Sequence, residues 1–343
     1  MSALPEQTNA NEQPEWMRRA ERGNRFWLAV MRWMSLALGR SVSRALLPFI
    51  ALYFTIAVPA ARRSSRDYLR RCLRRRPTLA DAYRHILAFS ATIHDRIYIL
   101  NDRRDLFDVR LSGFEPLHAH IAAQGGVLLF GAHLGSFEIL RAGAARDLPG
   151  ARVLMAMYSE NARQVNRMLA AINPEAVQDI IELGHVDSML RVHQRLNEGA
   201  VIGVLADRAA GPSQFVRVPF LGSPAPFPFG PFRMATILRR PVYFMAGLYR
   251  GGNRYDLHFE LLTDFSRPMD PRSNAVRELL DGYVAALERH CRSAPYNWFN
   301  FYPFWRSAKG ADALAEGALS AQALAKGDVS SEALAKEDGH DGG

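Results

Sequence analysis

The chain has 343 residues, of which 48% are hydrophobic, so it can bury one large or two small globular cores. Its two cysteines, Cys72 and Cys291, are too few and too far apart for a disulfide framework or a cysteine metal cluster, and its histidines are scattered, so we expect no metal, no cofactor and a reducing compartment. The net charge of +9 is concentrated in residues 1–110, which hold 20 arginines and 10 acidic residues. This basic region favours phospholipid headgroups or an acidic protein as partner. The lack of zinc-ligand spacing and of RNA-binding aromatic motifs argues against nucleic acid.

The N-terminal third predicts a polar, disordered leader at 1–25 and a basic helical, membrane-associating region at 26–110. Within this region, residues 45–61 carry no charge. As a helix they would extend about 25 Å, less than the ~30 Å hydrocarbon core of a bilayer. Arginines flank the run on both sides, which favours a helix lying in the membrane interface. A buried amphipathic core helix is the alternative, and the polar leader and internal arginines disfavour a signal peptide.

Beyond this region, apolar side chains recur at helical spacing over 81–100, and strands then alternate with helices. We expect strands at 127–130, 153–156, 179–183, 201–205, 241–247 and 256–262, and helices at 161–172, 188–197 and 275–291. This alternation predicts an α/β domain at 111–306, with a mixed, mostly parallel sheet flanked by helices. Residues 307–343 are rich in small residues and poor in aromatics, which is typical of a low-complexity tail.

The end of the first buried strand holds the most informative residues. His133 stands at the strand-to-helix turn after 127–130, and Glu138 follows one helical turn later. This placement suits a general base whose ring is oriented by a carboxylate and which removes a proton from a hydroxyl nucleophile. The pair His193 and Glu198 has the same spacing but lies in an amphipathic helix, where residues five apart point about 140° from each other, so we expect it to be solvent-exposed.

A second strand end, at 201–208, finishes with Asp207 and Arg208, and a Pro-Phe-Leu-Gly stretch follows at 219–222. With these motifs the chain resembles the lysophospholipid acyltransferase superfamily, and most closely the bacterial lipid A biosynthesis (late) acyltransferases, over about 105–305. The residues that carry the resemblance are His133 and Glu138, a looser block of Tyr158, Asn161, Asn166 and Arg167, the Asp207–Arg208 pair, and Pro219 to Gly222 with Gly230. The chain departs from the family at Leu221, in the proline-aromatic run 224–232 and in its ending at 297–300.

The resemblance implies transfer of a fatty acyl group from an acyl thioester, carried by acyl carrier protein or by CoA, to a hydroxyl of a lipid acceptor. His133 and Glu138 would then be catalytic, and the amides of Gly135 and Ser136 would face the developing oxyanion. Further substrate-binding candidates are Tyr158, Asn161, Asp207, Arg208, Gly230 and Arg233, with the two arginines suited to phosphate and Asp207 alternatively capping a turn. Numerous aromatic residues at 220–232 and 299–305 either line an acyl groove or form core.

Such an enzyme would lie at the cytoplasmic face of the inner membrane, held peripherally or by a single N-terminal anchor. Acyl carrier protein is acidic, so the arginine-rich region suits it as well as lipid. Three alternatives remain open: acylation of an ornithine-, polyene- or glycerolipid; a serine hydrolase that uses Ser136, although no Gly-x-Ser-x-Gly motif is present; and a membrane-binding protein that keeps the fold without catalysis.

Overall fold

We describe a computed structural model of the chain. The structure describes residues 33, 35, 37, 39–139, 152–158, 169, 172, 180–185, 187–208, 215–266 and 274–305. The predicted leader, the tail and nearly all of the predicted helix at 161–172 lie outside these residues.

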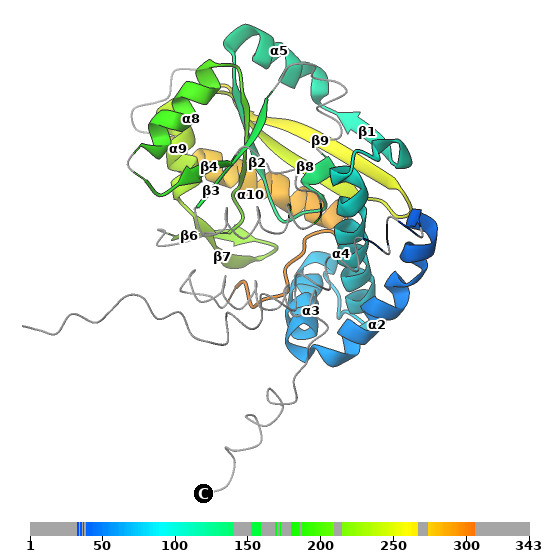
Figure 1. Cartoon of the computed structure of the whole chain (residues 1–343). Helices are drawn as coiled ribbons and strands as arrows, with labels where there is room; N and C mark the ends of the chain where they lie inside the picture. The colour runs from blue at the N-terminus through cyan, green and yellow to red at the C-terminus, as the bar shows by residue number, and fades with distance from the viewer. Residues whose placement is uncertain are drawn as a thin grey trace, which may run out of the picture.

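The centre of the fold is a seven-stranded sheet in the order β1-β9-β8-β2-β5-β3-β4 (Figure 1). Its strands are β1 (Asp108–Ser112), β2 (Val127–Gly131), β3 (Val153–Tyr158), β4 (Ile180–Leu183), β5 (Val201–Leu205), β8 (Val242–Tyr249) and β9 (Arg254–Thr263). Only β8 and β9 pair antiparallel, and the other neighbours pair parallel. The predicted mixed, mostly parallel α/β sheet is therefore confirmed, and all six predicted strands are present.

The central strands are apolar throughout because both faces of the sheet are covered. Leu128 and Phe130 of β2 belong to a core with α9 (Gly230–Leu238) and α10 (Ala275–Ser293), while Val127 and Leu129 point to the opposite face, toward α5 (Phe114–Gln124). Helix α8 (Ser188–Asn197) packs beside β4 and β5. The predicted helices at 188–197 and 275–291 are thus confirmed within two residues.

Four elements, three strands and one helix, were not predicted. A short 3-10 turn at Arg104–Leu106 leads into strand β1, which starts at Asp108 inside the region expected to be helical. Helix α5 follows β1. Strands β6 (Phe215–Phe220) and β7 (Ser223–Pro228) form a separate antiparallel hairpin. Leu221 and Gly222 make its two-residue turn with φ of 50° and 81°, the left-handed pair that such tight hairpins require.

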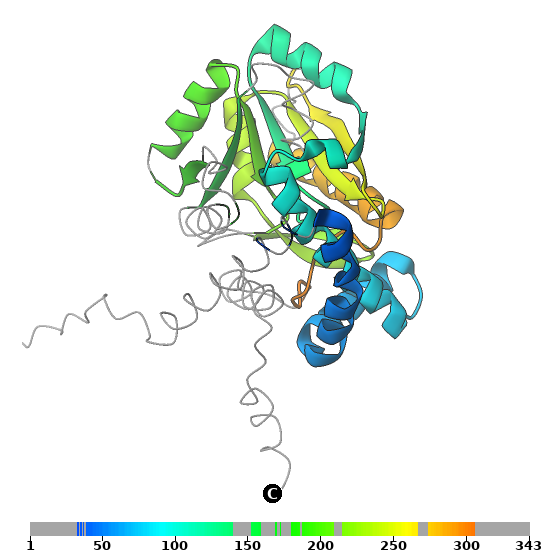
Figure 2. The same cartoon turned by 45° about the vertical axis from the view of Figure 1, so that its right-hand side comes forward.

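Helices of the N-terminal region pack together at one end of the sheet (Figures 1 and 2). They are α2 (Leu47–Ala57), which continues a helix from Gly39, α3 (Pro59–Leu73) and α4 (Leu79–Leu100). Proline at the first position of α3 fits a helix start and accompanies a 96° bend after Ala57. Within the described part of the chain, no single helix meets the length and hydropathy needed to span a bilayer; Gly39–Ala57 and Pro59–Leu73 meet it only as a bent pair.

Candidate active site

The site forms where the parallel neighbours β2 and β5 end. Gly131 and Leu205 are register partners, and the amide of Ala206 donates to the carbonyl of Gly131 at 3.0 Å. Each strand therefore delivers the residue two positions further, His133 and Asp207, to the same edge of the sheet. In the sheet, β3 lies beyond β5 and β8 lies beyond β2, so the connections that leave β2 and β5 run past each other in opposite directions.

His133 and Asp207 are directly hydrogen-bonded. The imidazole Nδ1 lies 2.9 Å from Oδ1 of Asp207, while Oδ2 accepts from the His133 amide at 3.1 Å and from Nε1 of Trp298 at 3.0 Å. Burial by itself raises the pKa of Asp207, but the charge interaction and hydrogen bond with His133, helped by Arg208 and Trp298, outweigh it and hold this pKa well below its ordinary value. Asp207 is therefore a fully buried carboxylate.

This hydrogen bond determines which ring nitrogen of His133 is basic. A carboxylate only accepts hydrogen bonds, so the proton of the neutral imidazole must reside on Nδ1, and Nε2 keeps its lone pair. The His133 side chain is 38% exposed and lines the pocket, and no other described side chain bonds to its ring. The arrangement leaves a positioned base at the pocket surface, with the buried Asp207 carboxylate behind it.

Glu138 does not hold the imidazole as the sequence had led us to expect. Its Oε1 lies 2.9 Å from Nε of Arg96 on α4, and its Oε2 accepts from the Ser136 hydroxyl at 3.2 Å. The strand register already places Asp207 beside His133, so that the orienting role belongs to Asp207. Glu138 instead lines the same pocket as a fixed carboxylate.

The amides of Gly135 and Ser136 cannot face an oxyanion in this structure, which corrects a second expectation. The first donates to the carbonyl of Asn297 and the second to that of Gly247, both at 2.8 Å. Gly135 has a φ of +73°, and a Cβ there would lie 1.9 Å from the Gly247 carbonyl oxygen, so only glycine fits. The Ser136 hydroxyl bonds to Glu138 and not to His133, so the serine–histidine contact of a serine hydrolase is not formed.

The segment 297–300 closes the site from the other side. Phe299 donates its amide to the carbonyl of His133 at 2.8 Å, and Trp298 forms an isolated bridge with Leu134 as well as the bond to Asp207. His85 of α4 is fully buried beneath it and pairs with the Trp298 carbonyl at 2.9 Å. The segment 297–300, where the chain departs from the family that it resembles, therefore fixes the loop that carries the histidine.

A mostly apolar pocket adjoins the His133 ring. It is bounded by one face of α4, by the loop after β2 and by the segment after Trp298; its lining residues include Phe89, Thr92, Ile93, Arg96, His133, Glu138, Leu205, Arg208, Phe299, Phe301 and Tyr302. Such a cavity, apolar with a few polar groups at one point, is typical of a site for a mostly hydrocarbon ligand. Of the predicted aromatic residues, Phe299 and Phe301 line it, whereas Phe220, Phe227, Phe232, Phe304 and Trp305 are core.

The remaining predicted residues lie in different surroundings. Arg208 borders the pocket, but its guanidinium donates to the Phe299 carbonyl at 2.7 Å and covers the Tyr302 ring, so it ties the 297–302 segment to the sheet. Gly230 starts α9, and Arg233 is exposed on the same helix; neither lines the pocket. Tyr158 ends β3, but its side chain lies outside the described part of the structure, as do Asn161, Asn166 and Arg167.

Two contributors were missed from the sequence. Arg96 gave no signal because it is one of 40 arginines in the chain, and Trp298 lies more than 150 residues from His133 along the chain. A signal did exist for the His133–Asp207 pair, since both residues follow buried strands and the carboxyl ends of parallel strands share one edge.

Comparison with known protein families matches residues 13–307 to the family described as bacterial lipid A biosynthesis acyltransferase. A search of curated proteins finds no match. The family match covers the N-terminal helices, the sheet, both members of the His133–Asp207 pair and the 297–300 segment, and it confirms the resemblance seen in the motifs. The chain therefore belongs to the bacterial lipid A biosynthesis acyltransferase family.

Proposed function

We propose that the protein transfers a fatty acyl group from an acyl thioester, acyl carrier protein or acyl-CoA, to a hydroxyl of a lipid A precursor, with His133 as general base. The family supports an acyltransferase that uses an acyl donor and a lipid acceptor. The observation that carries the mechanism is the pairing of His133 Nδ1 with the buried Asp207, which leaves Nε2 as the basic atom beside an apolar pocket.

In the proposed reaction, Nε2 of His133 takes the proton of the acceptor hydroxyl while its oxygen attacks the thioester carbonyl. The carbon–sulfur bond then breaks, the ester forms, and the imidazolium returns the proton to the leaving thiolate. Asp207 stabilises the imidazolium through the Nδ1 bond and needs no proton of its own, because its pKa lies far below neutral pH. Proton transfer by a positioned base of this kind contributes about 10²- to 10⁴-fold in rate.

Glu138 keeps a role in this proposal, but a different one. Its carboxylate is held on both oxygens by Arg96 and Ser136, so it presents fixed charge to the pocket next to the base. We assign it the positioning of the acceptor hydroxyl, to which a fixed carboxylate offers a hydrogen-bond acceptor. The acyl chain would lie along the apolar wall formed by Phe89, Ile93 and Phe301.

The proposed location is the cytoplasmic face of the inner membrane, where an acyl carrier and a membrane lipid meet. Support comes from α2, which consists almost entirely of apolar residues and whose outer side chains, including Phe49 and Ile56, are exposed. The arginine-rich first third of the chain suits anionic headgroups.

The test is acyl transfer by the purified full chain, with acyl carrier protein and CoA thioesters as donors and a lipid A precursor as acceptor, followed by mass spectrometry of the lipids. We expect His133→Ala to abolish the acylated product. The matched control is His193→Ala, which removes an exposed histidine from α8 and should leave turnover unchanged. Full turnover by the His133 variant would refute the mechanism, and product on a different lipid class would correct the acceptor.

A further inference from the structure

The proposed reaction places negative charge on an oxygen atom that the site has to stabilise. When the acceptor hydroxyl attacks, the electron pair of the thioester carbonyl moves onto its oxygen, and an oxyanion persists until the carbon–sulfur bond breaks. Donors aimed at such an oxygen are usually the largest single contribution to catalysis. The amides of His133, Gly135 and Ser136 all donate within the protein, so these backbone groups beside the base do not serve the oxyanion.

The pocket contains several polar side chains, and most of their donors are already bound. Nε of Arg96 and the Ser136 hydroxyl both lie on the Glu138 carboxylate. The Thr92 hydroxyl donates to a backbone carbonyl of its own helix at 2.8 Å. Besides Arg96, one arginine of the described chain lines the pocket, and it is Arg208.

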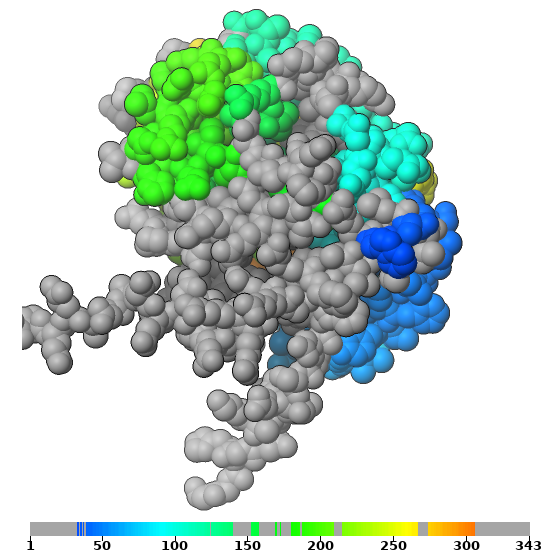
Figure 3. Space-filling view, in the orientation of Figure 1, coloured from blue at the N-terminus to red at the C-terminus, as the bar shows by residue number. Residues whose placement is uncertain are grey.

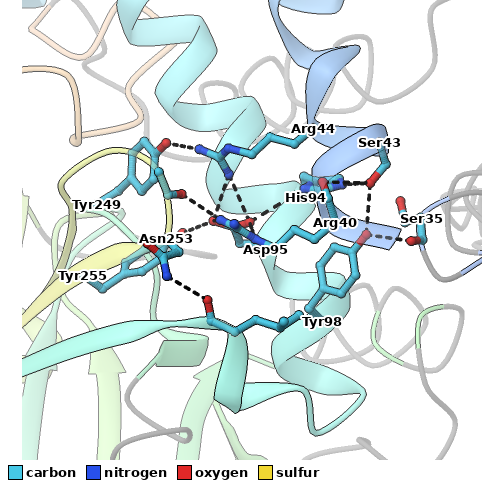
Figure 4. Close-up of polar contacts among 12 residues, drawn as sticks. Ser35, Arg40, Ser43, Arg44, His94, Asp95, Tyr98, Tyr249, Asn253 and Tyr255 are labelled. Atoms are coloured by element: carbon cyan, nitrogen blue, oxygen red, sulfur yellow. Dashed lines mark hydrogen bonds and ion pairs between the residues drawn. The ribbon is translucent and has the colours of Figure 1, made fainter. Parts of the chain in front are cut away.

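The arginines that precede α4 in the described chain do not line the pocket. Figure 4 shows two of them, Arg40 and Arg44, on the buried carboxylate of Asp95 at 2.9 and 3.2 Å, where the Tyr255 hydroxyl also binds at 2.8 Å. This network joins the helix that begins at Gly39 to α4 and to β9. The arginines at 63, 66 and 70 are exposed on α3, which is part of the blue outer surface in Figure 3. These guanidinium groups are therefore not available to a substrate in the pocket.

The guanidinium of Arg208 is held in a fixed plane. Its Nη2 donates to the Phe299 carbonyl at 2.7 Å, its buried Nε lies 3.7 Å from Oδ2 of Asp207, and its carbon lies 4.8 Å from the centre of the Tyr302 ring. Nε and Nη2 form one edge of the group, and this edge faces the protein. The third nitrogen, Nη1, bonds to no group of the described chain and is not buried. It therefore keeps two N–H donors for a ligand.

The free nitrogen belongs to the same pocket as the base. The Arg208 side chain is only 14% exposed and borders the pocket, so the pocket is where Nη1 can meet a ligand. Asp207 contacts both groups, His133 through Oδ1 and Arg208 through Oδ2, so one buried carboxylate holds the base and the guanidinium beside each other. In an apolar pocket a full positive charge acts on an anion more strongly than it does in water.

We propose that Arg208 is a catalytic residue whose Nη1 donates to the oxyanion of the tetrahedral intermediate, while Nε2 of His133 holds the proton of the acceptor. This role rests on the proposed function, since it needs a thioester carbonyl in the pocket. When the intermediate collapses, the electron pair returns to the carbonyl, the carbon–sulfur bond breaks, and the imidazolium gives its proton to the leaving thiolate. Arg208 exchanges no proton, because a guanidinium stays charged. It binds the reacting oxygen and not a phosphate.

The experiment compares Arg208→Gln with Arg217→Gln, a control that removes an exposed arginine of β6 outside the pocket. Thermal midpoints establish that both variants are folded. Turnover is measured with tetradecanoyl thioesters of CoA and of acyl carrier protein. The same donors, labelled with ¹³C at the carbonyl, are then bound without any acceptor, and infrared difference spectra report how strongly the protein polarises the carbonyl bond.

We expect Arg208→Gln to lower kcat about 10²- to 10³-fold with little change in KM, as for the loss of one oxyanion donor. On the wild type the bound carbonyl should absorb at lower frequency than in solution, and this shift should disappear in Arg208→Gln but persist in Arg217→Gln. Added methylguanidinium should restore part of kcat to Arg208→Ala, because it supplies the missing donor, and none to His133→Ala.

Full kcat in folded Arg208→Gln would overturn the inference. A loss of kcat that leaves the carbonyl frequency unchanged would overturn it too, since Arg208 would then act only by holding the 297–302 segment. A wild type that shows the carbonyl shift, lost in Arg208→Gln, but acylates no lipid would refute the proposed function while supporting the role of Arg208.

Discussion

The substitution Asp207→Asn tests the basis of the proposed chemistry, because it changes charge and hydrogen-bonding pattern with little change in shape. The carboxylate accepts from three donors, the His133 amide and Trp298 Nε1 on Oδ2 and the imidazole Nδ1 on Oδ1. An asparagine side chain has one acceptor oxygen and one donor group. The orientation that retains most hydrogen bonds places its oxygen at the Oδ2 position and turns its NH₂ toward Nδ1.

That orientation forces Nδ1 to accept a hydrogen bond, so the ring proton moves to Nε2 and the pocket-facing nitrogen can no longer act as a base. Three hydrogen bonds survive and only their charge assistance is lost, so we expect a stability loss of about 1 to 2 kcal/mol. The expected loss of kcat is far larger, about 10³- to 10⁴-fold, as for the same change behind other catalytic histidines. Because the pKa of Asp207 lies well below its ordinary value, the loss should persist at every pH above about 5.

Two measurements separate this explanation from general damage. Nitrogen NMR of labelled histidine reports the tautomer of His133 directly, and we expect it to switch in Asp207→Asn. Glu138→Gln is the matched control, since this carboxylate lies in the same pocket without bonding to the ring, and the His133 tautomer should stay unchanged. A switch caused by Glu138→Gln but not by Asp207→Asn would show that our assignment of the orienting residue is wrong.

Three further outcomes follow from the packing around the site. Gly135→Ala should cost about 3 kcal/mol or more and abolish activity, because its Cβ would meet the Gly247 carbonyl oxygen, whereas Gly282→Ala in α10, with open space at its Cβ, should be neutral or stabilising in thermal denaturation. Burial lowers the pKa of His85 to about 4, although its bond to the Trp298 carbonyl opposes this shift. The unfolded chain therefore binds more protons between pH 6.5 and 4, so the free energy of unfolding should fall by about 3 kcal/mol as the pH is lowered across that window. In His85→Gln, the free energy of unfolding measured by denaturant titration at several pH values should depend less on pH. Asp95→Asn leaves Arg40 and Arg44 without their buried carboxylate partner. We expect the free energy of unfolding to fall by about 3 kcal/mol and proteolysis within 39–57 to become faster. Unchanged cleavage would argue against the role of Asp95 in holding this helix in place.

The sheet could be predicted because its central strands are short apolar runs between turn residues. Elements with a weaker signal escaped: β1 alternates between exposed and half-buried positions and contains no long apolar run. The hairpin of β6 and β7 contains four prolines, which ordinarily argue against a strand. They are tolerated here because the hairpin stands outside the main sheet and pairs only with itself.

Several residues of the candidate site could be predicted from the sequence, but Arg96, Trp298 and the arrangement of the site could not. His133 and Asp207 were both recognised, yet the spacing of five residues suggested Glu138 as the partner of the ring. Spacing along the chain describes only local geometry, whereas the actual partner depends on the order of strands in the sheet. The amides of Gly135 and Ser136 were misjudged for the same reason, since Asn297 and Gly247, which take their hydrogen bonds, are distant in sequence.

The tertiary contacts also bear on how the chain divides. A boundary near 110 was expected to separate a membrane-associating region from a catalytic domain, but α4 supplies four of the residues that line the pocket. His85 supports the Trp298 carbonyl, and Tyr296 donates to Asp81 at 2.7 Å, so the segment that closes the site rests on this helix. Removal of residues before 111 would therefore expose apolar pocket wall and leave the His133 loop without its support. The N-terminal helices are therefore a structural part of the site.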